Sequence, residues 1–142
     1  MTHEEIRACM DRWVKAWTAE DLDGLVACYG EQAELISPLL HTVRGIAAIE
    51  RSHQDLFHAF SDIAAEVHDI VIDAEDQRAV LVFTTHATQQ REFLGFPASG
   101  RRTATQMAFV FHFKDGRIIS ERRLYDFTGF LMQLGILKAK GA

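Results

Sequence analysis

The chain has 142 residues, of which 48% are hydrophobic and 25% are charged, a composition typical of a globular protein rather than a disordered or fibrous one. Its net charge of -5, from 15 Lys and Arg against 20 Asp and Glu, argues against nucleic acid or a membrane surface as partner, because both attract concentrated basic charge. Since no apolar run approaches the roughly 20 residues that span a bilayer and residues 1–12 lack a signal-peptide core, we expect one cytoplasmic domain over residues 1–142.

The first half of the chain is predicted to be mainly helical. In residues 4–19 apolar side chains recur every three or four positions, which indicates one buried face of a helix. Asp21 is placed to cap a second, shorter helix that ends near Gly30. A third helix over residues 46–60 carries His53 on its apolar stripe, so we expect this imidazole to face inward.

The second half of the chain is predicted to be mainly strands. Two short strands, interrupted at Pro38 because proline supplies no sheet donor, precede the third helix at residues 33–36 and 39–43. Four longer strands follow it, at residues 65–72, 78–88, 101–113 and 118–126, and a short helix over 127–137 leads into a frayed end at 138–142. This order predicts an α+β fold in which helices cover one face of an antiparallel sheet.

The last two strands are joined by Asp115-Gly116, which predicts a two-residue hairpin that pairs Lys114 with Arg117. In this register His112 points away from Asp126, whereas a bulge or a three-residue loop would bring both to one face. The register places one set of residues on a common face: Met107, Phe109, Phe111, Phe113, Ile118, Ser120, Arg122, Leu124 and Asp126.

Several short motifs stand out in this layout: Trp13-Val14-Lys15-Ala16-Trp17, Gly45-Ile46-Ala47-Ala48-Ile49, the loop from Gly95 to Arg101, the hairpin Phe113 to Ile118, and Gln133-Leu134-Gly135. In this order they resemble motifs of the SnoaL-like polyketide cyclase group, within the nuclear transport factor 2-like superfamily. The resemblance implies a cone-shaped, barrel-like, curved antiparallel sheet. Three helices from the N-terminal half would close a hydrophobic pocket, and a short helix would end the chain.

Asp126 matches the aspartate that serves as acid/base for intramolecular aldol-type ring closure in the cyclases. A carboxylate in an apolar cavity is suited to this work, because burial disfavours its charged form. The alternative is that Asp126 caps the following helix near Thr128 and Gly129, as Asp often does where a strand gives way to a helix.

Two further residues are candidates for assisting Asp126. Arg122 would stabilise an enolate or carboxylate formed from the substrate, or would be a surface arginine paired with Glu121. His112 lies where a histidine assists the aspartate in similar cyclases, or is an imidazole on the helix-facing or outer side of the sheet.

Five residues are candidates for shaping or lining the pocket. Trp13 and Trp17 belong either to the core or to the pocket wall, since the first helix contributes to this wall in the related fold. His53 is either a pocket donor or a core histidine bound to a backbone carbonyl. Met107 and Phe109 are expected on the pocket side of their strand.

The sequence contains no metal-ligand spacing and no phosphate-binding glycine loop, so we expect neither a metal nor a cofactor. The resemblance, with Asp126 as acid/base, implies an enzyme of the cyclase, isomerase or dehydratase type that transfers a proton on carbon in a hydrophobic small molecule. Two alternatives stay open: a module that binds a hydrophobic ligand without converting it, and an assembly domain. In either case a sheet face left uncovered favours a homodimer.

Overall fold

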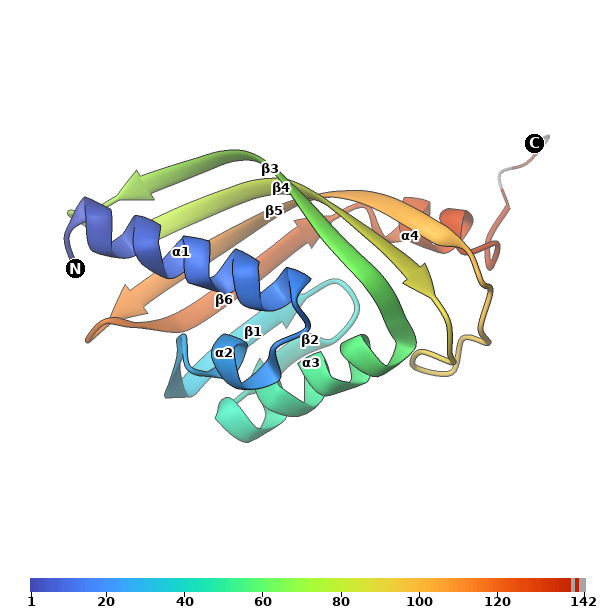
Figure 1. Ribbon diagram of the computed structural model, residues 1–142, viewed down its shortest axis with the longest axis horizontal. Coiled ribbons are helices and arrows are strands. Elements are labelled where there is room, and N and C mark those ends of the chain that lie inside the picture. Colours follow the sequence, from blue (N-terminus) through green and yellow to red (C-terminus); the bar gives the residue numbers. More distant parts are fainter. Residues whose placement is uncertain (139, 141–142) are drawn as a thin grey trace.

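The computed structural model describes residues 1–138 and 140, and within them four helices and six strands (Figure 1). In chain order these are α1 (His3–Thr18), α2 (Leu22–Val26), β1 (Tyr29–Ser37), β2 (His41–Arg44), α3 (Ile46–Ala59), β3 (Phe60–Asp73), β4 (Arg78–Gln89), β5 (Arg102–Lys114), β6 (Arg117–Tyr125) and α4 (Phe127–Gln133). The predicted α+β fold is confirmed, with helix and strand in the expected order.

The six strands form one curved, unclosed sheet in the order β2-β1-β6-β5-β4-β3. All neighbouring strands are antiparallel except β1 and β6, which run parallel. The expectation of a wholly antiparallel sheet is therefore wrong for this pair. Because most of the chain separates β1 from β6, no hairpin fixes their relative direction.

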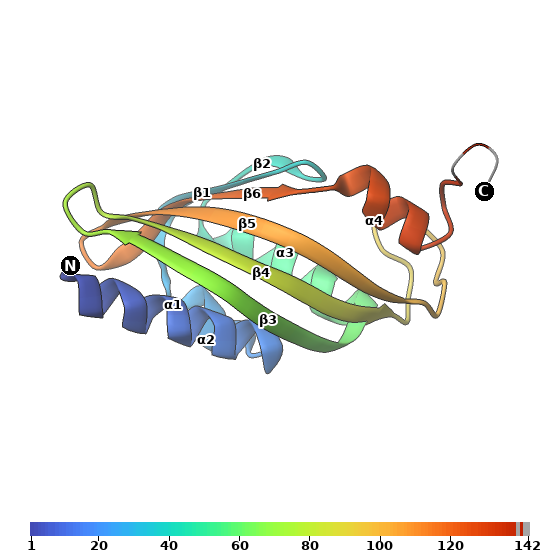
Figure 2. The same ribbon diagram turned by 90° about the horizontal axis from the view of Figure 1, so that it is seen from above.

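Three helices lie on the concave side of the sheet, as the two views show (Figures 1 and 2). Helix α1 begins at the cap residue Thr2, whose hydroxyl accepts from the backbone N–H of Glu5, and it buries the apolar face that the sequence predicts. Its Trp13 is fully buried and meets three phenylalanines of β4 and β5 edge to face: Phe83, Phe109 and Phe111. This aromatic cluster joins the helix to the middle of the sheet.

The predicted hairpin between β5 and β6 is present, with Lys114 paired to Arg117 around a turn of two positive-φ residues. Asp115 has a φ of 52° and Gly116 a φ of 77°, as this tight turn requires. Beyond the turn the register shifts, because Phe113 pairs with Ile118 but His112 pairs with Ser120. The skipped residue, Ile119, is thus a bulge in β6.

This bulge decides which side chains of β6 face inward, because a shift of one residue turns a strand over. The residues that pair with Phe111, Phe109 and Met107 on the concave side are Glu121, Arg123 and Tyr125. The residues expected there instead share the other face with His112, Val110 and Ala108: Ser120, Arg122 and Leu124. The register predicted for the second half of the hairpin is therefore wrong by one residue.

Several element boundaries differ from the prediction, and the largest difference is the start of β3, at Phe60 instead of residue 65. The second helix ends at Val26 and β1 already begins at Tyr29, while α4 ends at Gln133 instead of residue 137. The fraying expected for 138–142 falls largely outside the described residues.

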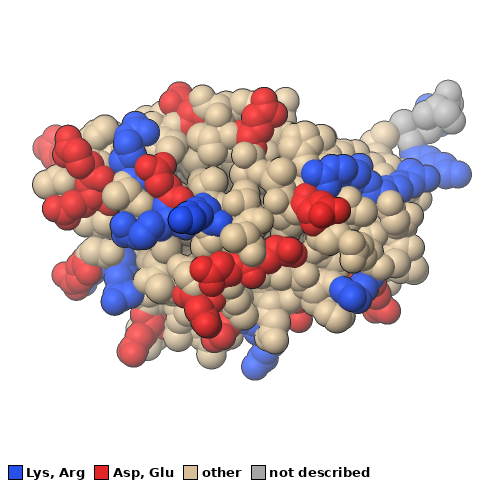
Figure 3. Space-filling model, in the orientation of Figure 1, with Lys and Arg blue, Asp and Glu red and all other residues tan. Residues whose placement is uncertain are grey.

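Charged side chains are spread over the surface. On the face shown in Figure 3, Lys and Arg are intermixed with Asp and Glu. In the part of the chain that the structure describes, no helix is both long and apolar enough to cross a membrane.

Candidate functional site

A cavity of about 80 Å³ lies between the concave face of the sheet and the helices. It is smaller than the roughly 300 Å³ at the lower end of sites for drug-sized ligands, so it suits a small compound. Apolar side chains make up most of its wall, together with a few hydroxyls and one guanidinium. The lining residues are Trp17, Ser37, Leu39, Leu40, Ser52, Leu56, Phe60, Ile63, Thr85, Ala87, Phe93, Thr103, Thr105, Met107, Phe109, Arg123, Tyr125 and Phe130.

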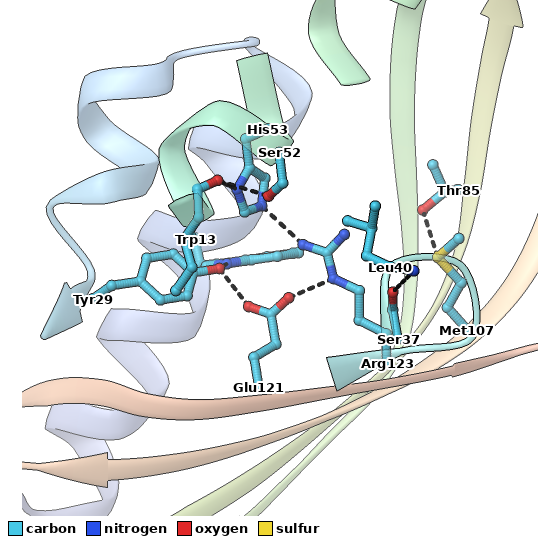
Figure 4. Close-up of polar contacts among 11 residues, drawn as sticks. Trp13, Tyr29, Ser37, Leu40, Ser52, His53, Thr85, Met107, Glu121 and Arg123 are labelled. Carbon is cyan, nitrogen blue, oxygen red and sulfur yellow. Dashed lines mark hydrogen bonds and ion pairs between the residues drawn. The ribbon is translucent and has the colours of Figure 1, made fainter. Parts of the chain in front are cut away.

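Arg123 of β6 is the charged group on this wall. Its Nε donates to Glu121 Oε2 at 2.6 Å, and its Nη2 donates to His53 Nε2 at 2.8 Å. The guanidinium carbon lies 4.8 Å from the ring centroid of Phe109 and 5.3 Å from that of Trp17. In Figure 4 the third guanidinium nitrogen points away from these partners, toward the side where Leu40 lies. The cation is thus held rigidly, with one nitrogen directed to the cavity side.

Glu121 balances the charge of Arg123 from within the core. Its side chain is fully buried, and its second carboxylate oxygen accepts from the hydroxyl of Tyr29. Tyr29 in turn accepts from the indole N–H of Trp13 at 2.9 Å. Burial and the neighbouring charge of Glu121 raise the pKa of Tyr29 well above its ordinary value, so the hydroxyl keeps its proton and donates it. Both carboxylate oxygens are therefore satisfied, as a buried charge requires.

His53 of α3 holds Arg123 from the opposite side. Its Nδ1–H donates to the backbone carbonyl of Ile49 at 2.9 Å, which leaves Nε2 free to accept from Arg123. Burial first, and then the charge of Arg123, lower the pKa of His53 to about 3. The imidazole is therefore neutral near pH 7 and acts as a fixed acceptor.

Burial disfavours the charged form of Arg123, but the charge of Glu121 outweighs this effect, and the pKa of Arg123 is raised above its ordinary value. The guanidinium therefore keeps its charge in the core. Desolvation also raises the pKa of Tyr125, the next inward residue of β6, although Arg123 acts against it. The wall thus offers a permanent cation and a protonated phenol.

Most of the smaller polar groups on the wall already have partners. The hydroxyl of Ser37 accepts from the backbone N–H of Leu40, and those of Ser52 and Thr103 donate to backbone carbonyls. The hydroxyl of Thr85 donates to the sulfur of Met107 at 3.5 Å. Two buried polar atoms have no partner among the described residues: Nε1 of Trp17 and Oγ1 of Thr105.

The structure places the predicted catalytic residues away from this cavity. Asp126 is exposed, and its carboxylate accepts from the backbone N–H of Gly129 at 2.9 Å, so it caps α4 as the alternative interpretation held. Arg122 is exposed on the convex side of the sheet, where His112 also lies. The bulge at Ile119 turns Arg122 to the convex face, where His112 lies in either register, so the predicted residues do not converge on the pocket.

The structure places three of the five predicted pocket residues on the cavity wall. Trp17, Met107 and Phe109 line the cavity. Trp13 lies in the core behind the wall, bound to Tyr29. His53 binds a backbone carbonyl, as its alternative interpretation held, but it also contacts the pocket through Arg123.

Sequence reasoning missed Glu121, Arg123, Tyr125 and Thr105. The first three alternate along β6, a pattern typical of one strand face. The adjacent Ile118 and Ile119 are the available signal, because two neighbouring apolar residues allow the strand to take either register.

The curved sheet and its covering helices define a cone-shaped α+β fold of the nuclear transport factor 2-like type. Residues 10–121 match the model of the SnoaL-like domain family, and the chain therefore belongs to this family. No curated protein matches the chain in sequence.

Solved structures with the same fold span nearly all of the chain. TsrD from Streptomyces laurentii is 24% identical, with a TM-score of 0.84 over 96% of this chain and 99% of its own. AclR from Streptomyces galilaeus, a candidate hydroxylase, is 27% identical, with a TM-score of 0.82 over 97% and 89%. A candidate SnoaL-like polyketide cyclase from Jannaschia sp. CCS1 is 20% identical, with a TM-score of 0.85 over 95% and 94%.

Proposed function

We propose that this protein is an enzyme that acts on a small, largely apolar carbonyl compound, and that Arg123 stabilises the negative charge that develops on the carbonyl oxygen. One observation carries the proposal: a guanidinium fixed by Glu121 and His53 lies on the wall of an otherwise mostly apolar cavity. Family membership supports an enzyme of this general kind, since one relative in fold is called a cyclase and another a hydroxylase.

The reaction class is proton transfer on the carbon next to the carbonyl group. The C–H bond breaks, its electron pair forms a C=C double bond while the π pair of the carbonyl moves onto the oxygen to give an enolate, and the proton goes to a base. A preorganised cation beside that oxygen stabilises the enolate strongly in a mostly apolar cavity, because nothing has to reorganise as the charge appears. The enolate then takes a proton at carbon, as in an isomerase, or attacks a second carbonyl, as in a cyclase.

The base is assigned to solution. The described residues that line the cavity include neither a carboxylate nor a histidine, and Glu121 is occupied by Tyr29 and Arg123. We therefore propose that water or a dissolved buffer base takes the proton, and Asp126, which caps α4, has no part in this step.

Hydrogen–deuterium exchange tests this proposal without knowledge of the natural substrate. Cyclohexanone is incubated with the protein in D2O, and the loss of its α-proton signals is followed by NMR. We expect catalysed exchange that increases with buffer-base concentration. It should fall by about 10²–10³-fold when the guanidinium is removed, as for other donors to an oxyanion.

The variant for this test is the pair Glu121→Leu with Arg123→Met, because Arg123→Met alone leaves a buried carboxylate unpaired. Arg122→Met is the matched control, since Arg122 is the neighbouring exposed arginine. Exchange that survives in the double variant would refute the role of Arg123.

A second candidate function is binding without conversion. It is favoured by the lack of a base among the described residues on the cavity wall. In that case cyclohexanone would bind, and the double variant would bind it less tightly, but the wild-type protein would not accelerate exchange.

A further inference from the structure

Two of the polar groups on the cavity wall have no role in the network around Arg123. Nε1 of Trp17 and Oγ1 of Thr105 are buried without a hydrogen-bond partner among the described residues, and the two residues are only 3% and 4% exposed. A buried polar atom without a partner costs free energy, so in native proteins such atoms usually have a functional explanation or a bound partner. Both residues belong to the cavity wall, so a ligand bound in the cavity would lie beside both.

Trp17 lies next to the cation. The guanidinium carbon of Arg123 is 5.3 Å from the Trp17 ring centroid. The indole N–H and the guanidinium are both hydrogen-bond donors only, so each needs an acceptor. The acceptor that suits a cation and a neutral donor together is an oxygen with negative charge.

Thr105 belongs to a different part of the wall. It shares the inward face of β5 with Met107 and Phe109, and Phe109 is the residue that pairs with Arg123. Four residues of a strand span about 13 Å, so Thr105 lies roughly that far along β5 from Phe109. The guanidinium carbon of Arg123 lies 4.8 Å from the ring centroid of Phe109, so a single ligand oxygen cannot bind both Arg123 and Thr105.

The wall between these two ends is largely apolar, apart from the phenol of Tyr125, which pairs with Met107 in the β5–β6 ladder. Met107 lies between them on β5, and the hydroxyl of Thr85, which pairs with Thr105 across the ladder, donates to the Met107 sulfur. The neighbouring Thr103 hydroxyl donates to the carbonyl of Ala87. An apolar body is thus expected to connect the two polar ends of the ligand.

We propose that the cavity takes a substrate with two oxygen atoms at opposite ends of a short apolar body, the first bound by Arg123 and Trp17 and the second by Thr105. Small diketones and hydroxyketones have this chemistry. The inference rests on the proposed function, because it assigns the first oxygen to the carbonyl that becomes the enolate.

The test compares two probes that share one ring, cyclohexanone with one oxygen and 1,4-cyclohexanedione with two. Binding is followed through the indole N–H signals in a two-dimensional NMR spectrum. The chain has two tryptophans, and Trp13, whose indole N–H donates to Tyr29, serves as the internal control. A Trp17→Phe variant assigns the two signals.

We expect the dione to shift the signal of Trp17 and to leave that of Trp13 in place. Thr105→Val should weaken dione binding by about 3- to 10-fold, the usual effect of one lost hydrogen bond, and should leave cyclohexanone binding unchanged. Thr88→Val is the matched control, because its hydroxyl already accepts from Arg102 and it does not line the cavity, and it should change neither affinity.

If Thr105→Val weakens the binding of both probes equally, or does not weaken the binding of the dione, Thr105 does not bind the second oxygen. If the dione binds without shifting the Trp17 signal, Trp17 does not bind the first oxygen. Either result can coexist with the Arg123-dependent exchange of cyclohexanone, which tests the proposed function separately.

Discussion

Arg123 lies opposite Phe109 in the ladder between β5 and β6, with its guanidinium carbon 4.8 Å from the ring centroid of Phe109. This stacking, together with the bonds to Glu121 and His53, fixes a charge at the border between core and cavity. A guanidinium tolerates such a place better than an ammonium would, because it is weakly hydrated and stacks on aromatic rings.

The ion pair between Arg123 and Glu121 should show strong energetic coupling. Removing one partner leaves a buried charge without compensation, so we expect Arg123→Met alone to lower the free energy of unfolding by about 3–5 kcal/mol. Adding Glu121→Leu should restore much of this loss, because two apolar side chains leave no charge behind. Chemical denaturation of the two single variants and the double variant measures the coupling, and additive losses would contradict it.

Stability should depend on pH through His53. Its pKa is about 3 in the folded protein and near 6.5 when the chain is unfolded, so between these values the unfolded state binds more protons. The contribution of the neutral imidazole is therefore complete above pH 6.5 and is lost as the pH falls toward 3. The slope is at most about 1.4 kcal/mol per pH unit.

Denaturation curves between pH 7 and pH 4 check this dependence. His53→Gln should flatten the slope, since glutamine also offers an acceptor to Arg123 but does not titrate. A slope unchanged in His53→Gln would assign the acid sensitivity to other groups.

Substitutions of Asp126 distinguish a role in capping α4 from a role in catalysis. Asparagine also caps helices well, so Asp126→Asn should leave both stability and the exchange of cyclohexanone nearly unchanged. Asp126→Ala should lower stability by about 1 kcal/mol through the lost cap, again without affecting exchange. If Asp126→Asn abolishes exchange, the aspartate is the acid/base after all, and the assignment of the base to solution fails.

Much of the fold follows from local patterns. The helix expected over residues 4–19 is observed at His3–Thr18, and the Asp115-Gly116 turn pairs Lys114 with Arg117 as predicted. These features depend on periodicity within one element or on two turn residues, and both are visible in a single sequence.

The site residues could not be predicted from the same local patterns, because one inserted residue, Ile119, decides which side chains of β6 face the cavity. Ile119 bulges out of the β5–β6 ladder, and on the other side of β6 the pairing with β1 is also irregular, between Tyr29 and Glu34. This irregularity involves strands distant in sequence, so the local alternation of residues 117–125 does not specify it. Arg122 was therefore predicted to face the pocket in the place of Arg123.

The homodimer predicted from the sequence remains to be measured. The convex side of the sheet exposes Val71 at 54% and Leu124 at 51%, and apolar residues of this kind are common at interfaces. If two copies pair through this face, Leu124→Glu should convert the dimer to a monomer in light scattering. Leu94→Glu, in the loop after β4, is the control and should have no effect. A monomeric wild-type protein in light scattering would contradict this prediction.

The most direct test of the central claim is the ionisation of bound 4-nitrophenol, read from the absorbance of its phenolate. If Arg123 stabilises an oxyanion in the cavity, the bound phenol should ionise at a lower pH than the free phenol. The shift should persist in Arg122→Met and disappear in the Glu121→Leu, Arg123→Met double variant. A bound phenol whose pKa is unchanged or raised in the wild-type protein would contradict the claim that this cavity stabilises negative charge on oxygen.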